Sequence, residues 1–197
     1  TPGLVFLNTA TGQIDLSASR SGTYTVTNTV DATICGGMTA TATVTVAGET
    51  WDGSDGSAWS NPANWSCGFV PITGTDILIP DVATDPVIGL GITGEAANIV
   101  IESGGSLTVS QGTIRISGSV VRNGIFDVSD GTAEFCGLSA QNAGNGIFSG
   151  NTVGNLTVNN NSGVTLQGPL NVSGVVLLQN GDMASDGNLT LLSDALQ

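Results

Sequence analysis

The chain has 197 residues, of which 40% are hydrophobic and only 10% are charged, so it can form one domain or two small ones with a real core. Its three basic residues are all arginines, histidine is absent, and the formal net charge is −13. This balance excludes nucleic acid as a partner, because phosphates must be neutralised by Lys and Arg, and the missing histidine removes the commonest general base.

The most abundant residues are Gly, Thr, Ser, Asn and Val, a composition that predicts an all-β protein with many turns. No apolar run is long enough to span a bilayer, so we expect no direct membrane insertion. The three cysteines have no metal-ligand spacing, and their odd number leaves at least one unpaired. Either Cys67 pairs with Cys136, or all three, with Cys35, are small buried thiols.

Residues 1–46 contain short runs of alternating hydrophobic residues separated by Gly, Asn and Asp, a pattern typical of an antiparallel β-sandwich. Tyr24 precedes Val26 by two positions, as in the tyrosine corner of immunoglobulin-like (Ig-like) folds, where a cysteine normally stands second. Such a sandwich has about seven strands, and only about four fit here. We therefore expect the C-terminal part of an Ig-like module from a longer chain, unless another chain donates the missing strands.

Residues 47–66 are rich in Gly, Ser, Asn and Asp and predict a junction between domains. Within "DGSDGS", Asp52 and Asp55 are the candidate metal ligands, because carboxylates and carbonyls of such a loop suit calcium. The alternative is that Asp-Gly is simply a turn signal. No other cofactor is indicated.

Tryptophan is scarce, yet Trp51, Trp59 and Trp65 all lie in this region and form the candidate ligand-binding group, since aromatic rings can stack on sugars. The alternative is structural, because a solenoid must cover its first coil to protect its apolar interior and its free strand edge. The structural interpretation predicts that Trp65, Phe69 and Ile79 are buried over the first coil.

Residues 67–197 predict a capped parallel β-solenoid, expected to be a right-handed β-helix, with an internal duplication that relates 98–135 to 155–192. "NIVIESGGSLTVSQGTIRISGSVVRNG" begins at residue 98 and "NLTVNNNSGVTLQGPLNVSGVVLLQNG" at residue 155, and both alternate apolar triplets with polar corners. Such units bury their apolar side chains only by stacking on one another. The offset between the copies predicts two to three coils. A second antiparallel sandwich is the alternative.

Each triplet has apolar residues at its ends and a polar residue between them, so its ends face one side of a strand. Leu107 and Val109 are therefore predicted to point inward. The middle threonines are predicted to point outward: Thr108, Thr157, Thr165 and Thr190.

The chain resembles a module of giant secreted surface proteins of Bacteroidetes, in which "W…NW…G.VP…D..IP" precedes apolar triplets and an "F.G...Q" turn. The triplets of this chain, its "AEFCGLSAQ" and its Ig-like first part fit that pattern. The matching residues are Trp59, Asn64, Trp65, Gly68, Val70, Pro71, Asp76, Ile79 and Pro80. The resemblance implies type IX secretion, a place at the cell surface, and roles such as gliding-motility adhesin or filament component. The sorting domain of that family is not found after "NLTLLSDALQ".

The candidates for an enzymatic role are Asp127, Asp130 and Glu134, the densest acid cluster of the solenoid, since a glycosidase needs two carboxylates that flank one bond. Arg115 and Arg122 are the only bases nearby, and solvated acids that keep the solenoid soluble explain the cluster better. We therefore expect a non-enzyme: an extracellular stalk, filament or adhesive segment of a bacterial surface protein.

Its expected partners are neighbouring domains of the same long chain, other surface-protein subunits or extracellular glycans. The alternative is a carbohydrate-binding or carbohydrate-active β-helix.

Overall fold

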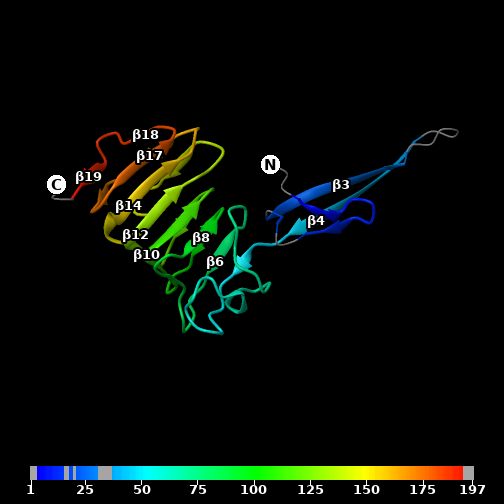
Figure 1. Cartoon of the computed structure of the whole chain (residues 1–197), viewed down its shortest axis with the longest axis horizontal. Coiled ribbons are helices and arrows are strands. Elements are labelled where there is room, and N and C mark those ends of the chain that lie inside the picture. Colours follow the sequence, from blue (N-terminus) through cyan, green and yellow to red (C-terminus); the bar gives the residue numbers. More distant parts are fainter. Residues whose placement is uncertain (1–3, 16–17, 20, 31–36, 193–197) are drawn as a thin grey trace. The chain divides into compact units, whose positions relative to one another are not determined.

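A computed structural model describes residues 4–15, 18–19, 21–30 and 37–192 and confirms a nearly all-β chain (Figure 1). The chain divides into two compact units, Thr1–Gly48 and Glu49–Gln197. The two helices of the described residues are 3₁₀ turns of three residues each, η1 (Pro62–Asn64) and η2 (Ser149–Asn151), and neither has the length or apolarity to cross a bilayer.

The described residues of the first unit form two antiparallel pairs, β1 with β2 and β3 with β4. Tyr24 donates a long hydrogen bond of 3.4 Å from its hydroxyl to the carbonyl of Ser21, as a tyrosine corner requires. These strands do not close a sandwich, because Leu4, Phe6 and Val26 line an open groove of about 640 Å³. Cys35 lies outside the described residues. The strands of this unit are β1 (Phe6–Asn8), β2 (Gln13–Ile14), β3 (Gly22–Val30) and β4 (Met38–Val46).

The second unit is a parallel β-solenoid of about six turns, in which each coil pairs with the next. From Ile77 onward, paired residues of successive coils are 19 to 25 positions apart, as in Leu107 with Phe126 and Val128 with Val153. Glu49 pairs with Ile77 across 28 positions. One eight-stranded sheet contains β7 (Val87–Ile88), β8 (Thr93–Ala96), β10 (Ser106–Ile116), β12 (Ile125–Phe135), β14 (Thr152–Asn159), β16 (Leu170–Val172), β17 (Val176–Asn180) and β19 (Leu189–Leu191).

Two smaller sheets complete the coils. The first contains β5 (Glu49–Thr50), β6 (Ile77–Ile79), β9 (Ile99–Ile101) and β11 (Val120–Arg122), and the second contains β13 (Gln141–Ala143), β15 (Val164–Leu166) and β18 (Met183–Ala184). Along the chain, each strand of these sheets from β6 onward precedes a strand of the large sheet. A coil therefore has three sides: one strand of a smaller sheet and two strands or half-strands of the large sheet.

The long strands of the large sheet turn a corner, and β10 shows how. Its inward residues are Leu107 and Val109 in the first half but Ile114 and Ile116 in the second, so the alternation changes parity between them. Gln111 lies at this corner with φ of 60°, a left-handed conformation that breaks the regular pleat. Each long strand therefore covers two faces of the solenoid.

Columns of aliphatic and aromatic side chains fill the interior, because parallel in-register pairing places equivalent residues above one another. The predicted inward and outward positions of the triplets are confirmed, with Leu107 buried and Thr108 half-buried. One column runs through Ala96, Ile116, Phe135, Val158 and Leu178. A second column runs through Val128, Val153, Val172 and Leu191.

The two sequence copies occupy different faces. Ile99–Ile101 of the first copy lies on the sheet of β6, β9 and β11, whereas the matching triplet 156–158 forms the second half of β14 in the large sheet. Likewise Leu107 and Val109 lie in the first half of β10, but their counterparts form β15. The offset therefore holds two full coils and two further faces, within the range of two to three coils that the sequence predicts.

Candidate functional site

The three tryptophans form one packed cluster at the first coil. Trp65 contacts both others edge to face, with ring centroids 5.1 Å from Trp51 and 4.8 Å from Trp59. The indole N–H of Trp65 donates to the carbonyl of Trp59 (2.9 Å), and that of Trp51 donates to the carbonyl of Thr84 (2.7 Å). The local fold follows from "NPANW": Asn61 caps η1 by accepting from the amide of Ala63.

The exposed fractions of Trp51, Trp59 and Trp65 are 0%, 1% and 2%, so these rings present no face on which a sugar could stack. Because the rings are buried against the first coil, the structure corrects their assignment as ligand residues and agrees with their capping role. Of the other residues predicted to be buried there, Ile79 is buried, whereas Phe69 is only half-buried.

The predicted junction spans residues 47–66, of which residues 49–66 are a folded part of the solenoid unit. β5 pairs in parallel with β6, and a β-bridge joins Trp51 to Trp65. These hydrogen bonds extend the sheet by one strand beyond the first complete coil. The boundary between the two units is therefore a short passage at Gly48 and Glu49 rather than a long linker.

The candidate calcium ligands are engaged in turns of this cap. Oδ1 of Asp52 accepts from the amide of Ser54 (2.9 Å), and Oδ2 of Asp55 accepts from the side-chain amide of Asn61 (2.9 Å). In the part of the chain that the structure describes, no three His, Cys, Asp or Glu side chains converge as metal ligands. Calcium at Asp52 and Asp55 stays a prediction, and the geometry accounts for both residues as turn formers.

Sequence reasoning missed a buried carboxylate, Glu49, which is 1% exposed. Its Oε2 accepts from the amide of Cys67 (3.0 Å) and from the hydroxyl of Ser66 (3.2 Å), while Oε1 has no hydrogen-bond partner. Glu49 thus ties the first strand of the cap to the segment after Trp65. A single acid in "AGETWDG" carries no signal of burial, because the residues it meets lie 17 and 18 positions later.

The acid cluster predicted from the sequence does not converge on one point. Asp127 lies in the first half of β12 and accepts from the amide and hydroxyl of Ser129, whereas Glu134 lies beyond the corner of the same strand. Asp130 lies at that corner and accepts from the hydroxyl of Ser110 (3.2 Å). The three carboxylates therefore do not flank one bond, as a glycosidase requires.

Glu134 belongs instead to a polar ladder that crosses the coils on the outside of the solenoid, defined by Glu95, Arg115, Glu134, Asn159 and Asn180. Arg115 bridges Glu95 (2.5 Å) and Glu134 (3.2 Å). The side-chain amide of Asn159 donates to Glu134 (2.9 Å), and that of Asn180 donates to Asn159 (2.7 Å). The ladder is ionic near the cap and made of amides toward the last coils.

Electrostatics keep the ionic part of the ladder charged. Burial lowers the pKa of Arg115, but the adjacent Glu134 and Glu95 carboxylates outweigh it and raise that pKa above its usual value. A raised pKa contributes stability that is lost only when pH rises through it, which for arginine lies in strong alkali. Arg115 is therefore a fixed charge, not a proton donor or acceptor.

A polar groove of about 290 Å³ lies where the two smaller sheets meet, lined by Asn98, Ser119, Ser139, Gln141 and Asn142 among others. Gln141 joins β13 to the segment between β10 and β11, since its amide donates to the carbonyls of Ile116 (3.0 Å) and Gly118 (2.9 Å) and its Oε1 accepts from the amide of Gly137 (2.7 Å). These hydrogen bonds explain the pattern "F.G...Q", because the glutamine of the turn binds the amide of its glycine and two carbonyls of the previous coil.

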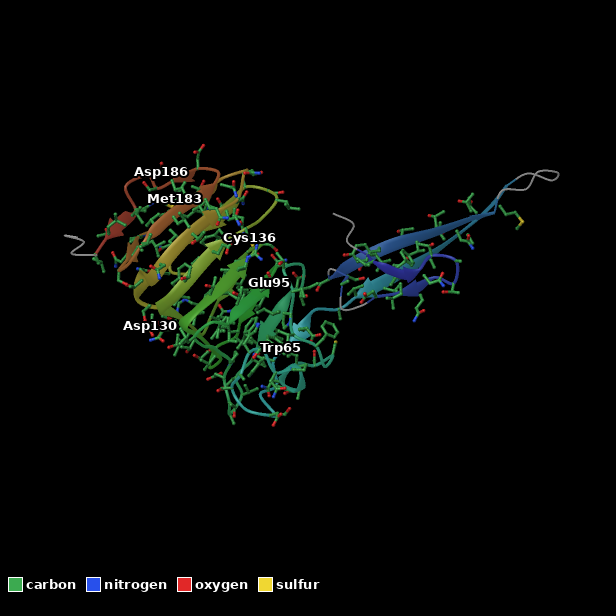
Figure 2. All side chains as sticks on the ribbon, in the orientation of Figure 1. Trp65, Glu95, Asp130, Cys136, Met183 and Asp186 are labelled. Carbon is green, nitrogen blue, oxygen red and sulfur yellow. The ribbon has the colours of Figure 1, made fainter. Side chains whose placement is uncertain are left out.

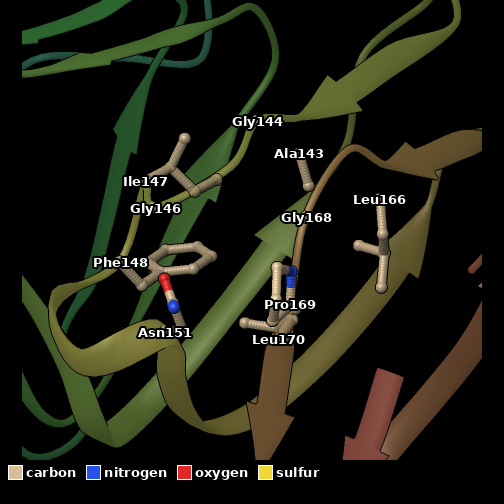
Figure 3. Close-up of a pocket in the computed structure, with 10 residues that line it drawn as sticks. All are labelled: Ala143, Gly144, Gly146, Ile147, Phe148, Asn151, Leu166, Gly168, Pro169 and Leu170. Carbon is tan, nitrogen blue, oxygen red and sulfur yellow. The ribbon is translucent and has the colours of Figure 1, made fainter. Parts of the chain in front are cut away.

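A second hollow, between the turn that carries η2 and the strand β16, has room for about 10 Å³ and so for roughly one water molecule (Figure 3). Ile147, Phe148 and Leu170 line it together with small residues. Phe148 also packs on Phe126 with ring centroids 5.1 Å apart. This hollow is a packing feature and not a ligand site.

The cysteine alternatives are resolved for two of the three residues. Cys67 is an exposed thiol and Cys136 a half-buried one, and no disulfide joins them. Arg115 lies close enough to the thiol of Cys136 for the two to interact electrostatically. The first coils are therefore held without a disulfide between these two cysteines, by packing, hydrogen bonds and the ion pairs of Arg115.

Comparison with known proteins gives one match. A family model described as a domain of unknown function, DUF8693, matches residues 50–149, which is half of the chain. The matched segment begins in β5 and ends in η2, so it contains the tryptophan cap, the ionic part of the ladder and the polar groove. No curated protein and no solved structure matches the chain.

Proposed function

We propose that this chain, which belongs to the DUF8693 family of domains of unknown function, is a non-enzymatic stalk, filament or adhesive segment of a secreted bacterial surface protein. One observation carries the proposal: successive coils repeat the same parallel pairing and the same inward columns, as in Ala96, Ile116 and Phe135. Such stacking adds length without changing the cross-section, which suits a spacer better than a reaction centre.

The outside of the solenoid supports this proposal. Its acids are held in local contacts, such as Asp127 with Ser129 and Glu134 with Arg115, rather than gathered around a ligand-sized cavity. Arginine at only three positions, with no lysine, leaves few sites for trypsin-like proteases. A solvated, protease-resistant segment is what an extracellular location demands.

Surface labelling tests the proposal. An antibody raised against this chain should label intact cells that produce it, and external protease should remove the label. Loss of the segment from its gene should then reduce attachment or movement on surfaces without loss of a hydrolytic activity. Labelling that requires permeabilised cells would contradict the proposal.

The polar groove favours the alternative, a carbohydrate-binding solenoid. Its lining of amides and hydroxyls, including Asn98, Ser119 and Asn142, is uncharged and suits the hydroxyl groups of a neutral glycan. A glycan array with the wild type and with Asn142→Ala tests this function, and Asp127→Asn in a polysaccharide hydrolysis assay tests the enzymatic version. Binding that Asn142→Ala abolishes would favour the alternative over a purely structural role.

A further inference from the structure

The stack of hydrogen-bonded strands on the side of the two smaller sheets is interrupted inside the solenoid. β11 pairs with β9 before it, and β13 pairs with β15 after it, but β11 and β13 do not pair with each other. Most of their Cα pairs lie more than 8 Å apart, whereas neighbouring strands of a sheet are about 4.8 Å apart. We call the space between β11 and β13 the strand gap.

The strand gap lies between coils and not at an end of the solenoid. The large sheet continues past it, since β12 pairs with β14 through Val128 and Val153. Figure 2 shows Cys136, which lies between β12 and β13, in the middle of the unit between Trp65 of the cap and Met183 of the last coils. Described coils therefore lie on both sides of the gap.

Longer connections explain why β13 stands away from β11. The connections that flank β13 are residues 136–140 and 144–151, whereas those that flank β11 are residues 117–119 and 123–124. The extra residues let β13 leave the regular rise of the coils. The side chain of Gln141, rather than a backbone group, then bridges to the carbonyl of Gly118 (2.9 Å).

Side-chain exposure shows that β11 is a sheet edge. Leu78, Val100 and Val121 form one outward column, in which the first two are half-buried and Val121 is 51% exposed. In the adjacent inward column Ile99 is fully buried, but Val120 is only half-buried. The sheet of β6, β9 and β11 is therefore uncovered at β11, although further coils follow.

Alternate backbone groups of β11 face the strand gap. The carbonyl of Ser119 and the amide of Asn123 both bond to the coil of β9. Because bonding directions alternate along a strand of a parallel pair, the N–H and C=O groups of Val120 and Arg122 point the other way. Among the described residues, none bonds to these groups.

On β13, one residue faces the gap in the same way. The amide of Gln141 and the carbonyl of Ala143 bond to the coil of β15, so the N–H and C=O groups of Asn142 point toward β11. No described residue bonds to them. The two edges thus present their free groups to each other across the gap.

A three-residue strand, parallel to both edges, would satisfy all of these groups that a sheet requires to pair. Its middle residue would donate to the carbonyl of Val120 and accept from the amide of Arg122. Its first residue would accept from the amide of Asn142, and its third would donate to the carbonyl of Asn142. A glycan has no backbone with this alternation, whereas strand addition is a common mode of peptide recognition.

The surroundings of the gap favour an uncharged segment. The polar groove at one end of the gap is lined by Asn98, Ser119, Ser139 and other residues, none of them charged. An added strand would place one side chain over Val120, where an unpaired charge would be costly. We propose that the strand gap binds an extended, uncharged segment of a partner polypeptide as an added parallel strand. The inference goes beyond the proposed function and does not depend on it.

Phage display of random heptapeptides on the immobilised full chain tests the proposal. Enriched peptides should be uncharged and rich in β-branched residues. Their synthetic versions should bind Asn142→Pro at least tenfold more weakly than the wild type. Proline removes the amide that faces the gap, but it leaves the bonds of Gln141 and Ala143 to the coil of β15 in place.

The matched control is Asn142→Ala, which removes the same side chain but keeps the amide. This variant should bind the peptides as the wild type does. A glycan held by the side chain of Asn142 would instead be lost in both variants, so the control separates strand addition from glycan binding in the adjacent groove.

Hydrogen exchange of the wild type, followed by NMR, gives a second readout without any substitution. The amides of Arg122 and Asn142 should exchange rapidly in the free chain and at least tenfold more slowly with a saturating peptide. The amide of Val121, which faces β9, should be protected in both states.

Slow exchange of the Arg122 and Asn142 amides in the free chain would overturn the proposal, because β11 and β13 would then pair directly. Enrichment of no peptide on the wild type, or equal binding of the peptides to Asn142→Pro, would overturn it as well. If a neutral glycan binds and Asn142→Ala abolishes that binding while no peptide is enriched, the groove belongs to the glycan and the gap to no partner.

Discussion

The apolar interior of the solenoid is covered at the first coil but exposed at the last described coil. At the first coil, three tryptophans with exposed fractions of 0–2% cover the interior, and indole hydrogen bonds fix two of them. At the last described coil, Leu178 and Leu191 stand at interior positions but are more than half exposed. The comparison teaches that the coil pattern alone does not close a solenoid, because closure requires residues from outside the pattern.

The largest expected effect comes from removing the centre of the cap. Trp65→Ala should lower the free energy of unfolding by about 3–5 kcal/mol, because Trp51 and Trp59 both pack on its ring. Urea unfolding followed by tryptophan fluorescence reports the second unit alone, since all three tryptophans lie in it. Leu138→Ala, at a 71% exposed position, is the control. A loss equal to that of the control would show that the cap does not hold the first coil.

The next effect compares glycines at the two ends. Gly53 (φ 61°) and Gly187 (φ 80°) both adopt left-handed conformations, so alanine strains either backbone similarly. At Gly53 the new Cβ would also clash with the Thr84 carbonyl that accepts from Trp51, whereas at Gly187 nothing lies within 4 Å. Gly53→Ala should therefore cost about 1–3 kcal/mol more than Gly187→Ala. If Gly53→Ala and Gly187→Ala lower the free energy of unfolding equally in the same unfolding experiment, the cap must accommodate the new Cβ without loss of stability.

A smaller effect tests the open end within one column. Val158→Ala should cost about 2 kcal/mol because it leaves a cavity. Leu178→Ala, one coil further, should change stability by less than about 0.5 kcal/mol although it removes a larger side chain. The two positions are direct partners, so only coverage differs. Thermal unfolding of both variants decides whether the last coil is uncovered in solution.

The smallest effect separates the two parts of the polar ladder. Arg115→Gln should cost about 1 kcal/mol or less at low salt, since the side chains of the ion pairs are 15–32% exposed, and the loss should shrink at high salt. Asn180→Ala removes the amide-to-amide hydrogen bond to Asn159 and should cost about 0.5 kcal/mol or less at both salt concentrations, because neither partner is charged. The same salt dependence in both variants would contradict this division.

The solenoid and its cap could be predicted because their signals are local. In a triplet such as Leu107, Thr108 and Val109, the alternation of apolar and polar residues alone predicts which side chains face inward. Aromatic residues immediately before the first triplet marked the cap for the same reason: closure is needed where coils begin. The tyrosine corner at Tyr24 is equally local, since its hydroxyl bonds only three residues upstream.

Other features depended on distances that the sequence does not state. Asp127 and Glu134 are seven positions apart in one strand, yet the corner between them separates their directions, and nothing in "IFDVSDGTAEF" marks that corner clearly. Glu49 is buried by residues 17 and 18 positions away. The polar ladder joins residues one coil apart, so it emerges only when the length of each coil is known.

The displacement of the two sequence copies by two full coils and two further faces has a consequence for how such a chain grows. A duplication of 57 residues, from 98 to 155, does not repeat the molecule in place but moves it along a screw. The second copy lies further along the axis and is turned by two of the three sides, so any outward motif that it inherits faces a new direction. A lineage that lengthens in this way would distribute one ancestral motif around the whole circumference, and the resulting fibre would have no preferred side.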